Sequence, residues 1–221
     1  MIKIKNLSKS FKLHDKSFHA LKDINLTINR GEAVLIRGES GSGKSTLLSI
    51  IAAIMKPTSG EVKFEGENIV SLSDIHLSNY RKKKIGFITQ GFHLFDELTV
   101  KENLLAPLVI QNITKDEINT ALHVAMKNAN IEHKKKQKVN TLSGGEKQRC
   151  IIARAIINNP EIIICDEPTA NLDIENSLAF IQILKKLKEN GKSILISTHD
   201  QIFSNLDFID KEVTLQSGTL G

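Results

Sequence analysis

Residues 38–45 carry the clearest chemical signal in the chain, because their types and spacing suit the binding of a phosphate chain. They satisfy the pattern G-x-x-x-x-G-K-[ST]. An apolar run at 33–36 precedes them, and an apolar segment that begins at Thr46 follows. The motif requires a strand before the loop and a helix after it, so this context favours a phosphate site over a flexible Gly/Ser turn. The residues expected to bind the phosphates are Gly38, Glu39, Ser40, Gly41, Ser42, Gly43, Lys44, Ser45 and Thr46.

The residue types of this loop each have a chemical use. Glycines let backbone N–H groups close around β- and γ-phosphate oxygens, and the following helix adds the positive end of its dipole. Lys44 supplies a mobile positive charge, and the Ser45 hydroxyl is positioned to bind Mg²⁺. The loop therefore predicts a nucleotide, together with Mg²⁺, as its ligand.

Two adjacent carboxylates follow a second apolar run. Asp166 and Glu167 come directly after residues 162–165, which predict a buried strand. In parallel sheets ligands bind at the carboxyl ends of the strands. We assign Asp166 to Mg²⁺, held directly or through water, and Glu167 to the attacking water as general base. The pair alone also suits two exposed turn carboxylates, and it is the phosphate loop that favours the catalytic interpretation.

Two more polar residues end predicted strands at the same edge. The run 194–198 leads to His199, where a neutral imidazole can hydrogen-bond a γ-phosphate oxygen or orient the base. Gln90 ends the strand expected at 85–89, where its side chain can reach water or the metal. The alternatives are a surface or helix-capping histidine and a glutamine that merely terminates a strand. The expected set is Lys44, Gln90, Glu167 and His199 for catalysis, and Ser45, Gln90 and Asp166 for the metal.

Residues 142–149 form a second candidate anion site. Ser143 can cap a helix, and Glu146 lies three residues later, the spacing of a capping box. A capping box alone is structural, but Gly144 and Gly145 add nothing to helix stability and leave N–H groups uncovered, as an anion site needs. One nucleotide cannot easily use both sites of the same chain. We therefore predict a head-to-tail dimer in which this segment closes over the γ-phosphate held by the other chain.

Short apolar runs alternate with helical patterns along most of the chain. Buried strands that alternate with helices predict βαβ units and a parallel sheet, hence an α/β fold. The helical stretch 92–158 is interpreted as a subdomain inserted into one domain, 1–221, whose core comprises 1–91 and 159–221. Strands are expected near 2–4, 24–28, 33–36, 61–65, 85–89, 161–165, 193–197 and 213–216, and helices over 46–55 (closed by Pro57), 100–110, 115–130, 144–158 and 175–190.

The composition bounds the class of protein. Of the 221 residues 40% are hydrophobic and 25% charged, and the net charge is +5, which fits one globular domain with an elaboration and excludes a disordered chain. No apolar run is long enough to span a bilayer, and no signal peptide opens the chain, so membrane insertion is not expected. Cys150 and Cys165 suit a reducing cytosol.

Two runs of positive charge, 81–84 and 133–138, are interpreted as solvated loops, with contact to an anionic surface as the alternative. Neither run is accompanied by an RNA-binding motif or by interleaved aromatic residues, and the chain has one Tyr and no Trp. Nucleic acid is therefore not expected as a partner.

The order and spacing of these segments resemble the ATP-binding subunits of ABC transporters. The resemblance covers essentially the whole chain. The run Leu142-Ser143-Gly144-Gly145 with Gln148-Arg149 is highly specific to this family. It implies a P-loop NTPase core of RecA-like type, with an antiparallel β arm and an inserted α-helical subdomain. It also implies ATP hydrolysis with Mg²⁺.

The resemblance implies roles for several more residues. Residues 143–145 look like the signature that contacts the nucleotide of the opposite chain, and Asp173 looks like the aspartate that acts across the dimer. Phe11 looks like the aromatic residue that stacks on adenine; the family often has Tyr there, and Phe keeps the ring. Glu39 stands where the family often has Pro, and Cys165 where a small residue is common, and we expect small effects from both.

Further motifs are similar to one group within the family. Segments 47–62, 80–87, 90–95 and 98–103 look like the group that includes the lipoprotein-release ATPase LolD, the efflux protein MacB and the division protein FtsE. This implies an ATP-dependent homodimer that drives a separate integral membrane subunit of the lipoprotein-release or macrolide-efflux type, from the cytoplasmic face of the inner membrane. The alternative is an FtsE-like ATPase that regulates cell-wall hydrolysis through its membrane partner.

Two other classes fit the sequence less well. Soluble ABC ATPases of DNA repair or translation usually carry two cassettes or a long coiled coil, which this chain lacks. A P-loop kinase would not need residues 142–148 and would need an acceptor pocket, which the sequence does not indicate.

Overall fold

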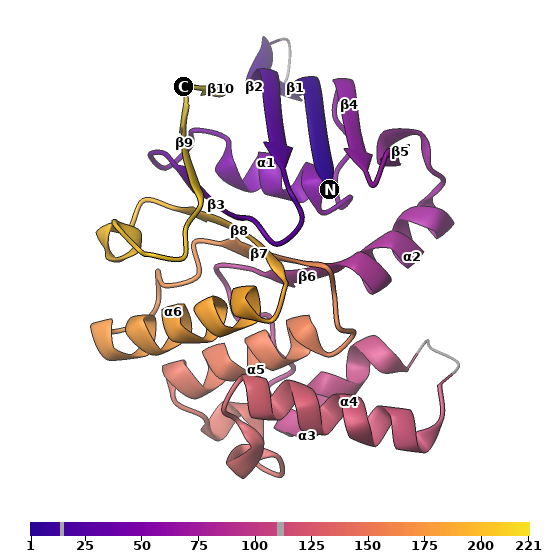
Figure 1. Cartoon of the computed structure of the whole chain (residues 1–221), viewed down its shortest axis with the longest axis vertical. Helices are drawn as coiled ribbons and strands as arrows, with labels where there is room; N and C mark the ends of the chain where they lie inside the picture. Colours follow the sequence, from indigo (N-terminus) through magenta and orange to yellow (C-terminus); the bar gives the residue numbers. More distant parts are fainter. Residues whose placement is uncertain (14–15, 110–112) are drawn as a thin grey trace.

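The computed structural model describes residues 1–13, 16–109 and 113–221. An antiparallel sheet lies at the top of the view in Figure 1, a mainly parallel sheet crosses the middle, and a group of helices lies at the bottom. This arrangement confirms the predicted α/β class with a parallel-sheet core, an antiparallel β arm and helices inserted between two strands of the core.

The central sheet positions the predicted site. Its order is β10-β9-β3-β8-β7-β6, with all neighbours parallel except β10, which pairs antiparallel with β9. Side chains of β3 alternate between two cores: Leu35 packs with the inserted helices, and Val34 and Ile36 pack with the antiparallel sheet. Both faces of the sheet are thus covered, as expected for buried parallel strands. The strands are β3 (Ala33–Arg37), β6 (Ile85–Ile88), β7 (Ile162–Asp166), β8 (Ser193–Thr198), β9 (Lys211–Gln216) and β10 (Thr219–Leu220).

The antiparallel sheet has the order β2-β1-β4-β5. Ile2 and Ile4 are buried while Lys3 and Lys5 are exposed, which is the alternation of a strand with one face on a core. The β1–β2 ribbon rises to the top of the view in Figure 1. The strands are β1 (Ile2–Leu13), β2 (Lys16–Ile28), β4 (Ser59–Phe64) and β5 (Glu67–Asn68).

Polar capping residues define the starts of the inserted helices. Thr99, Thr114 and Ser143 each form a capping box with a glutamate three residues later. The helices are α1 (Lys44–Ile51), α2 (Asp74–Lys84), α3 (Val100–Leu105), α4 (Lys115–Asn128), α5 (Gly144–Ile156) and α6 (Ile174–Glu189), and short 3₁₀ turns occupy 69–71, 106–108, 132–134, 139–141 and 201–203. None of the helices in the described ranges combines the length and the apolar composition that crossing a membrane requires.

Two of the predicted helices are shorter than expected. The helix expected over 46–55 ends at Ile51, well before Pro57, because Ala53 has φ +55°, outside helical geometry. The helix expected over 100–110 ends at Leu105 and tightens to a 3₁₀ turn that contains Pro107; Ile110 lies outside the described residues.

The positive run 81–84 is the last turn of helix α2, and the interpretation as a solvated loop was wrong. Arg81 donates to the carbonyl oxygen of Ala53 at 2.8 Å, and Lys84 forms an ion pair with Glu161. These contacts tie the run to the core, and its position at a helix C-terminus complements the helix dipole.

Candidate nucleotide-binding site

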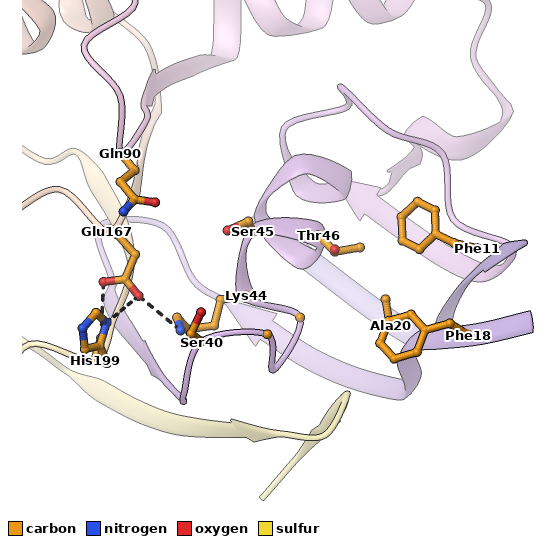
Figure 2. Close-up of a pocket in the computed structure, with 12 residues that line it drawn as sticks. Phe11, Phe18, Ala20, Ser40, Lys44, Ser45, Thr46, Gln90, Glu167 and His199 are labelled. Atoms are coloured by element: carbon orange, nitrogen blue, oxygen red, sulfur yellow. Dashed lines mark hydrogen bonds and ion pairs between the residues drawn. The ribbon is translucent and has the colours of Figure 1, made fainter. Parts of the chain in front are cut away.

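A cavity of about 400 Å³ lies where the phosphate loop meets the carboxyl ends of the central strands. Figure 2 shows its lining from three sources: the β1–β2 ribbon, the loop with the start of α1, and the residues after β6, β7 and β8. The sequence-predicted residues that line it are Phe11, Ser40, Gly41, Gly43, Lys44, Ser45, Thr46, Gln90, Glu167 and His199.

The conformation of the loop depends on glycine. Gly43, just before α1, has φ +108°, and a Cβ there would lie 2.5 Å from the carbonyl oxygen of Ala20. Gly41, which also lines the cavity, has φ +81° and open space where a Cβ would point. The backbone can therefore approach a ligand closely here, as a phosphate-binding loop requires.

Lys44 is buried beneath this loop. Its ammonium donates to the carbonyl oxygens of Gly38 at 2.7 Å and Glu39 at 3.0 Å, and lies 3.1 Å from Glu167 Oε1. The side chain of Lys44 is 5% exposed and that of Glu167 is 11% exposed. A buried positive charge thus stands at the inner end of the cavity, held by three oxygen atoms.

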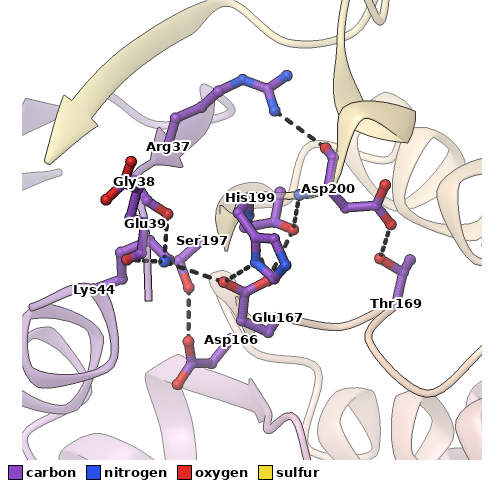
Figure 3. A network of polar contacts seen from close by, with 11 residues as sticks. Arg37, Gly38, Glu39, Lys44, Asp166, Glu167, Thr169, Ser197, His199 and Asp200 are labelled. Atoms are coloured by element: carbon purple, nitrogen blue, oxygen red, sulfur yellow. Dashed lines mark hydrogen bonds and ion pairs between the residues drawn. The ribbon is translucent and has the colours of Figure 1, made fainter. Parts of the chain in front are cut away.

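The carboxylate of Glu167 is the centre of a polar network, drawn in Figure 3. It accepts hydrogen bonds from Thr198 Oγ1 at 3.0 Å and contacts His199 Nδ1 at 3.0 Å. Burial raises the pKa of Glu167, but hydrogen bonds with His199, Lys44 and Thr198 outweigh that effect and hold its pKa below the ordinary value. The backbone of Glu167 has φ +45°, a left-handed conformation that turns the chain directly after β7. The site therefore holds an ionised, oriented carboxylate.

Asp166 and Gln90 lie beside this network. Asp166 ends β7 and accepts a hydrogen bond from Ser197 Oγ at 2.7 Å; it does not line the cavity. The side chain of Gln90 does line the cavity, and its backbone oxygen accepts from Asn171 Nδ2 at 3.1 Å. Figure 2 shows Gln90 above Glu167, on the side of Ser45.

The donors at this edge suit a magnesium ion that is held mainly by phosphate and water. Ser45, Gln90 and Asp166 offer hydroxyl, amide and carboxylate oxygens, the hard donors that Mg²⁺ prefers. The described residues contain no group of three or more His, Cys, Asp or Glu side chains that could hold a metal ion. A site of this kind needs only one or two protein ligands beside the substrate phosphates, so the residues present fit Mg²⁺.

The end of the cavity away from Glu167 is aromatic. Phe11 and Phe18 line it from adjacent strands together with Ala20. Phe18 was missed by the sequence analysis, which expected this strand only from residue 24. The available signal was the alternation of Phe18 and Ala20, on one side of the strand, with Ser17 and His19 on the other.

Several predicted residues lie outside this cavity. Gly38, Glu39 and Ser42 line a second cavity of about 390 Å³ on the other side of the loop, against residues 214–217. The Ser42 hydroxyl is buried without a hydrogen-bond partner.

The residues predicted to act across a dimer also lie apart from the cavity. Ser143 caps α5, with its backbone N–H donating to Glu146 at 2.8 Å. Asp173 caps α6 and accepts from the backbone N–H of Asn176 at 2.8 Å. Gly145 packs directly against the Asn176 side chain, so a Cβ there would overlap it. The starts of α5 and α6 are thus adjacent, and Gly144, beside them, is exposed.

Comparisons with known proteins agree with this geometry. A sequence model of the ABC transporter family matches residues 21–170. The chain is 43% identical over 205 residues to the ABC transporter ATP-binding protein MJ0796 of Methanocaldococcus jannaschii, covering 90% of this chain and 87% of that protein. It is 40% identical over 201 residues to the lipoprotein-releasing system ATP-binding protein LolD of Buchnera aphidicola, covering 90% and 88%. It is 39% identical over 221 residues to the macrolide export protein MacB of Campylobacter fetus, covering 100% of this chain and 34% of that protein.

A solved structure gives the same result at the level of the fold. The dimeric, post-hydrolysis structure of MJ0796 bound to ADP and Pi matches with a TM-score of 0.89 and 40% identity, covering 100% of this chain and 96% of that chain. The match to the family model, the identity with these relatives and the geometry of the cavity agree, and the chain belongs to the ABC transporter family as an ATP-binding protein.

Proposed function

We propose that this ABC ATPase binds ATP in the cavity between the phosphate loop and Glu167, and that it hydrolyses ATP there with Glu167 as general base. The observation that carries this proposal is the ionised Glu167 carboxylate, held by His199 and Thr198 beside the buried ammonium of Lys44. A carboxylate with a lowered pKa is available at neutral pH to accept a proton from water.

The other residues of the cavity either stabilise charge or position the reacting groups. Lys44 and the N–H groups of residues 40–46 stabilise the negative charge of the phosphoryl group being transferred. His199 holds Glu167 in place, and Gln90 positions the attacking water. Phe11 contacts the nucleobase of ATP. Mg²⁺ would be held by Ser45, with Asp166 and Gln90 nearby, and would neutralise phosphate charge.

We also propose an ATP-dependent homodimer. Ser143, Gly144 and Gly145 do not line the cavity of their own chain, and Ser143 and Gly144 are exposed at the start of α5, where N–H groups suit an anion. These residues would complete the site of a second copy, with Asp173 at the same contact. The relative MJ0796 forms a dimer in its ADP-bound and Pi-bound structure, which supports this arrangement.

The domain organisation follows from this assignment. Residues 1–91 and 159–221 form the ATPase core with its β arm, and residues 92–158 form the helical subdomain that carries the signature. The helices of this subdomain, α3, α4 and α5, share one hydrophobic core with one face of the central sheet, which supports a subdomain attached to the core rather than a separate body.

The partner we propose is a separate integral membrane subunit, of the lipoprotein-release or macrolide-efflux type. The identity with LolD and with MacB, a macrolide export ATP-binding/permease protein, supports this. Bound to such a partner, the chain would lie on the cytoplasmic face of the inner membrane. The alternative in the same group is an FtsE-like ATPase that regulates cell-wall hydrolysis, and the partner distinguishes the two.

Two experiments test these proposals. ATP hydrolysis by the purified chain, compared with Lys44→Ala, tests the site; equal rates for both proteins would overturn it. A pull-down of Glu167→Gln from detergent-solubilised membranes with ATP, read by mass spectrometry, tests the partner. A co-purifying protein with few transmembrane helices and a large outer domain is expected, and its outer domain would separate release, efflux and division. A many-helix permease would overturn the subgroup, and soluble partners alone would overturn the transport role.

A further inference from the structure

Two phenylalanine side chains stand side by side at the outer end of the nucleotide cavity. Phe11 on β1 is the direct cross-strand partner of Phe18 on β2, so both project to the same face of the ribbon. Both line the cavity and both are exposed: Phe11 is 38% exposed and Phe18 is 59% exposed. Among the described residues the ring–ring contact is between Phe64 and Tyr80, so Phe11 and Phe18 do not cover each other.

One face of the Phe11 ring is already occupied. The ammonium of Lys9 lies over the ring, 5.1 Å from its centroid, and donates to the carbonyl oxygen of Lys56 at 2.8 Å. Lys9 does not line the cavity, whereas Phe11 does. The lysine therefore holds the ring from outside and leaves its cavity-facing side free for a planar ligand.

Among the described residues that line this end of the cavity, none has a side chain that can read the edge of a nucleobase. Phe11, Phe18 and Ala20 present carbon only, and Thr46 stands at the first turn of α1, toward the phosphate loop (Figure 2). The next register pair, Ser10 and His19, is polar and joined by a contact of 2.9 Å. Neighbouring residues of a strand project to opposite faces, so that pair points away from the cavity.

From this placement we propose that Phe18 is a second base-contacting residue, and that Phe11 and Phe18 hold the base by stacking and apolar contact alone. The inference rests on the proposed function, since it needs the triphosphate to lie on the loop. It names the substrate class more widely than ATP: nucleoside triphosphates with different bases are accepted. Every base has an aromatic face, so stacking tolerates the change of base, whereas a site that hydrogen-bonds the base rejects the wrong one by about 10⁴-fold.

The experiment measures equilibrium binding of the imido analogues of ATP and GTP, and of inorganic tripolyphosphate, to the full chain. We expect wild type to bind the two analogues within about tenfold of each other. Phe18→Ala should weaken both analogues by about tenfold, as loss of one base-stacking ring does, and leave tripolyphosphate unchanged. His19→Ala, on the opposite face of the ribbon, is the matched control and should change none of the three, and Phe18→Tyr should retain binding.

Two results would overturn the inference while leaving the site intact: Phe18→Ala that binds both analogues as wild type does, or a wild type that prefers one base by more than about 100-fold. A Phe18→Ala protein that loses tripolyphosphate as well would show a loop defect and count against the assignment to the base. If wild type binds neither the analogues nor tripolyphosphate, the proposed function itself fails.

Discussion

The ammonium of Lys44 lies 3.1 Å from the carboxylate of Glu167, and both side chains are largely buried. This ion pair joins the phosphate loop to the residue after β7. A triphosphate on the loop would bring more negative charge to the same ammonium. Lys44 is therefore placed to interact with both the substrate and the general base, Glu167. His199 Nδ1 contacts the same carboxylate oxygen as Lys44, Oε1, and Thr198 donates to the other oxygen, Oε2.

Replacement of Glu167 by Gln separates binding from hydrolysis. The amide keeps the shape of the side chain but cannot accept a proton from water, so hydrolysis should fall by at least about 100-fold. ATP binding should remain, and the ATP-bound dimer should accumulate in size-exclusion chromatography with ATP. Glu189→Gln, at the exposed end of α6, is the control and should behave as wild type. A Glu167→Gln protein that stays monomeric beside a dimerising wild type would contradict the proposed order of events.

The pKa of Glu167 makes a prediction about pH. A carboxyl with a lowered pKa is ionised at neutral pH and loses its charge only as the pH falls through that lowered value. His199→Ala removes one hydrogen bond that lowers this pKa, so the acid limb of the kcat profile should move to higher pH. His123→Ala, on the exposed face of α4, is the control. An unshifted acid limb in His199→Ala would contradict the proposed role of His199 in holding Glu167.

Most of the site could be predicted because its chemistry is local in sequence. Lys44 and Ser45 belong to a glycine pattern typical of phosphate binding, and Glu167 and His199 follow short apolar runs typical of buried strands. What could not be predicted depends on register and context. Phe18 reaches the cavity because the β1–β2 ribbon pairs it with Phe11, and single-sequence alternation at 16–20 is too short to establish that pairing.

The helix α2 shows the same limit for the fold. It buries only Leu77 among its eleven residues, so it carries no apolar stripe that would predict a helix. Tertiary contacts hold it instead. Arg81 donates to the carbonyl oxygen of Ala53, just after α1, and Lys84 pairs with Glu161, just before β7. A run of positive charge with such partners cannot be told from a solvated loop by composition.

Substitution of Ser143 tests the dimer. Ser143→Arg places a bulky cation at the exposed start of α5, so the second copy cannot close over the nucleotide and hydrolysis should be lost. Binding of ATP by the same chain should stay within a few-fold of wild type, because Ser143 does not line that cavity. A large loss of ATP affinity in the monomer would instead place Ser143 in the site of its own chain.

Thr114→Arg is the matched control for Ser143→Arg. Thr114 forms the same capping box on α4, with Glu117, as Ser143 forms on α5 with Glu146. Each substitution removes one N-cap and should lower the free energy of unfolding by about 1 kcal/mol. Only Ser143→Arg should lose hydrolysis, so comparable loss in both variants would mean that the cap, and not the contact with a second copy, is what matters.

Ser45→Ala tests the metal site by a measurement other than activity. If the Ser45 hydroxyl binds Mg²⁺ beside the phosphates, Mg²⁺ should strengthen ATP binding to wild type, and that gain should shrink in the variant. Calorimetric titration of ATP with Mg²⁺ and with EDTA measures the difference. Ser49→Ala, one turn further along α1 and away from the cavity lining, is the matched control and should keep the full gain. An equal gain in Ser45→Ala and wild type would show that Mg²⁺ is held without this hydroxyl, by phosphate, water and the remaining oxygens of Gln90 and Asp166.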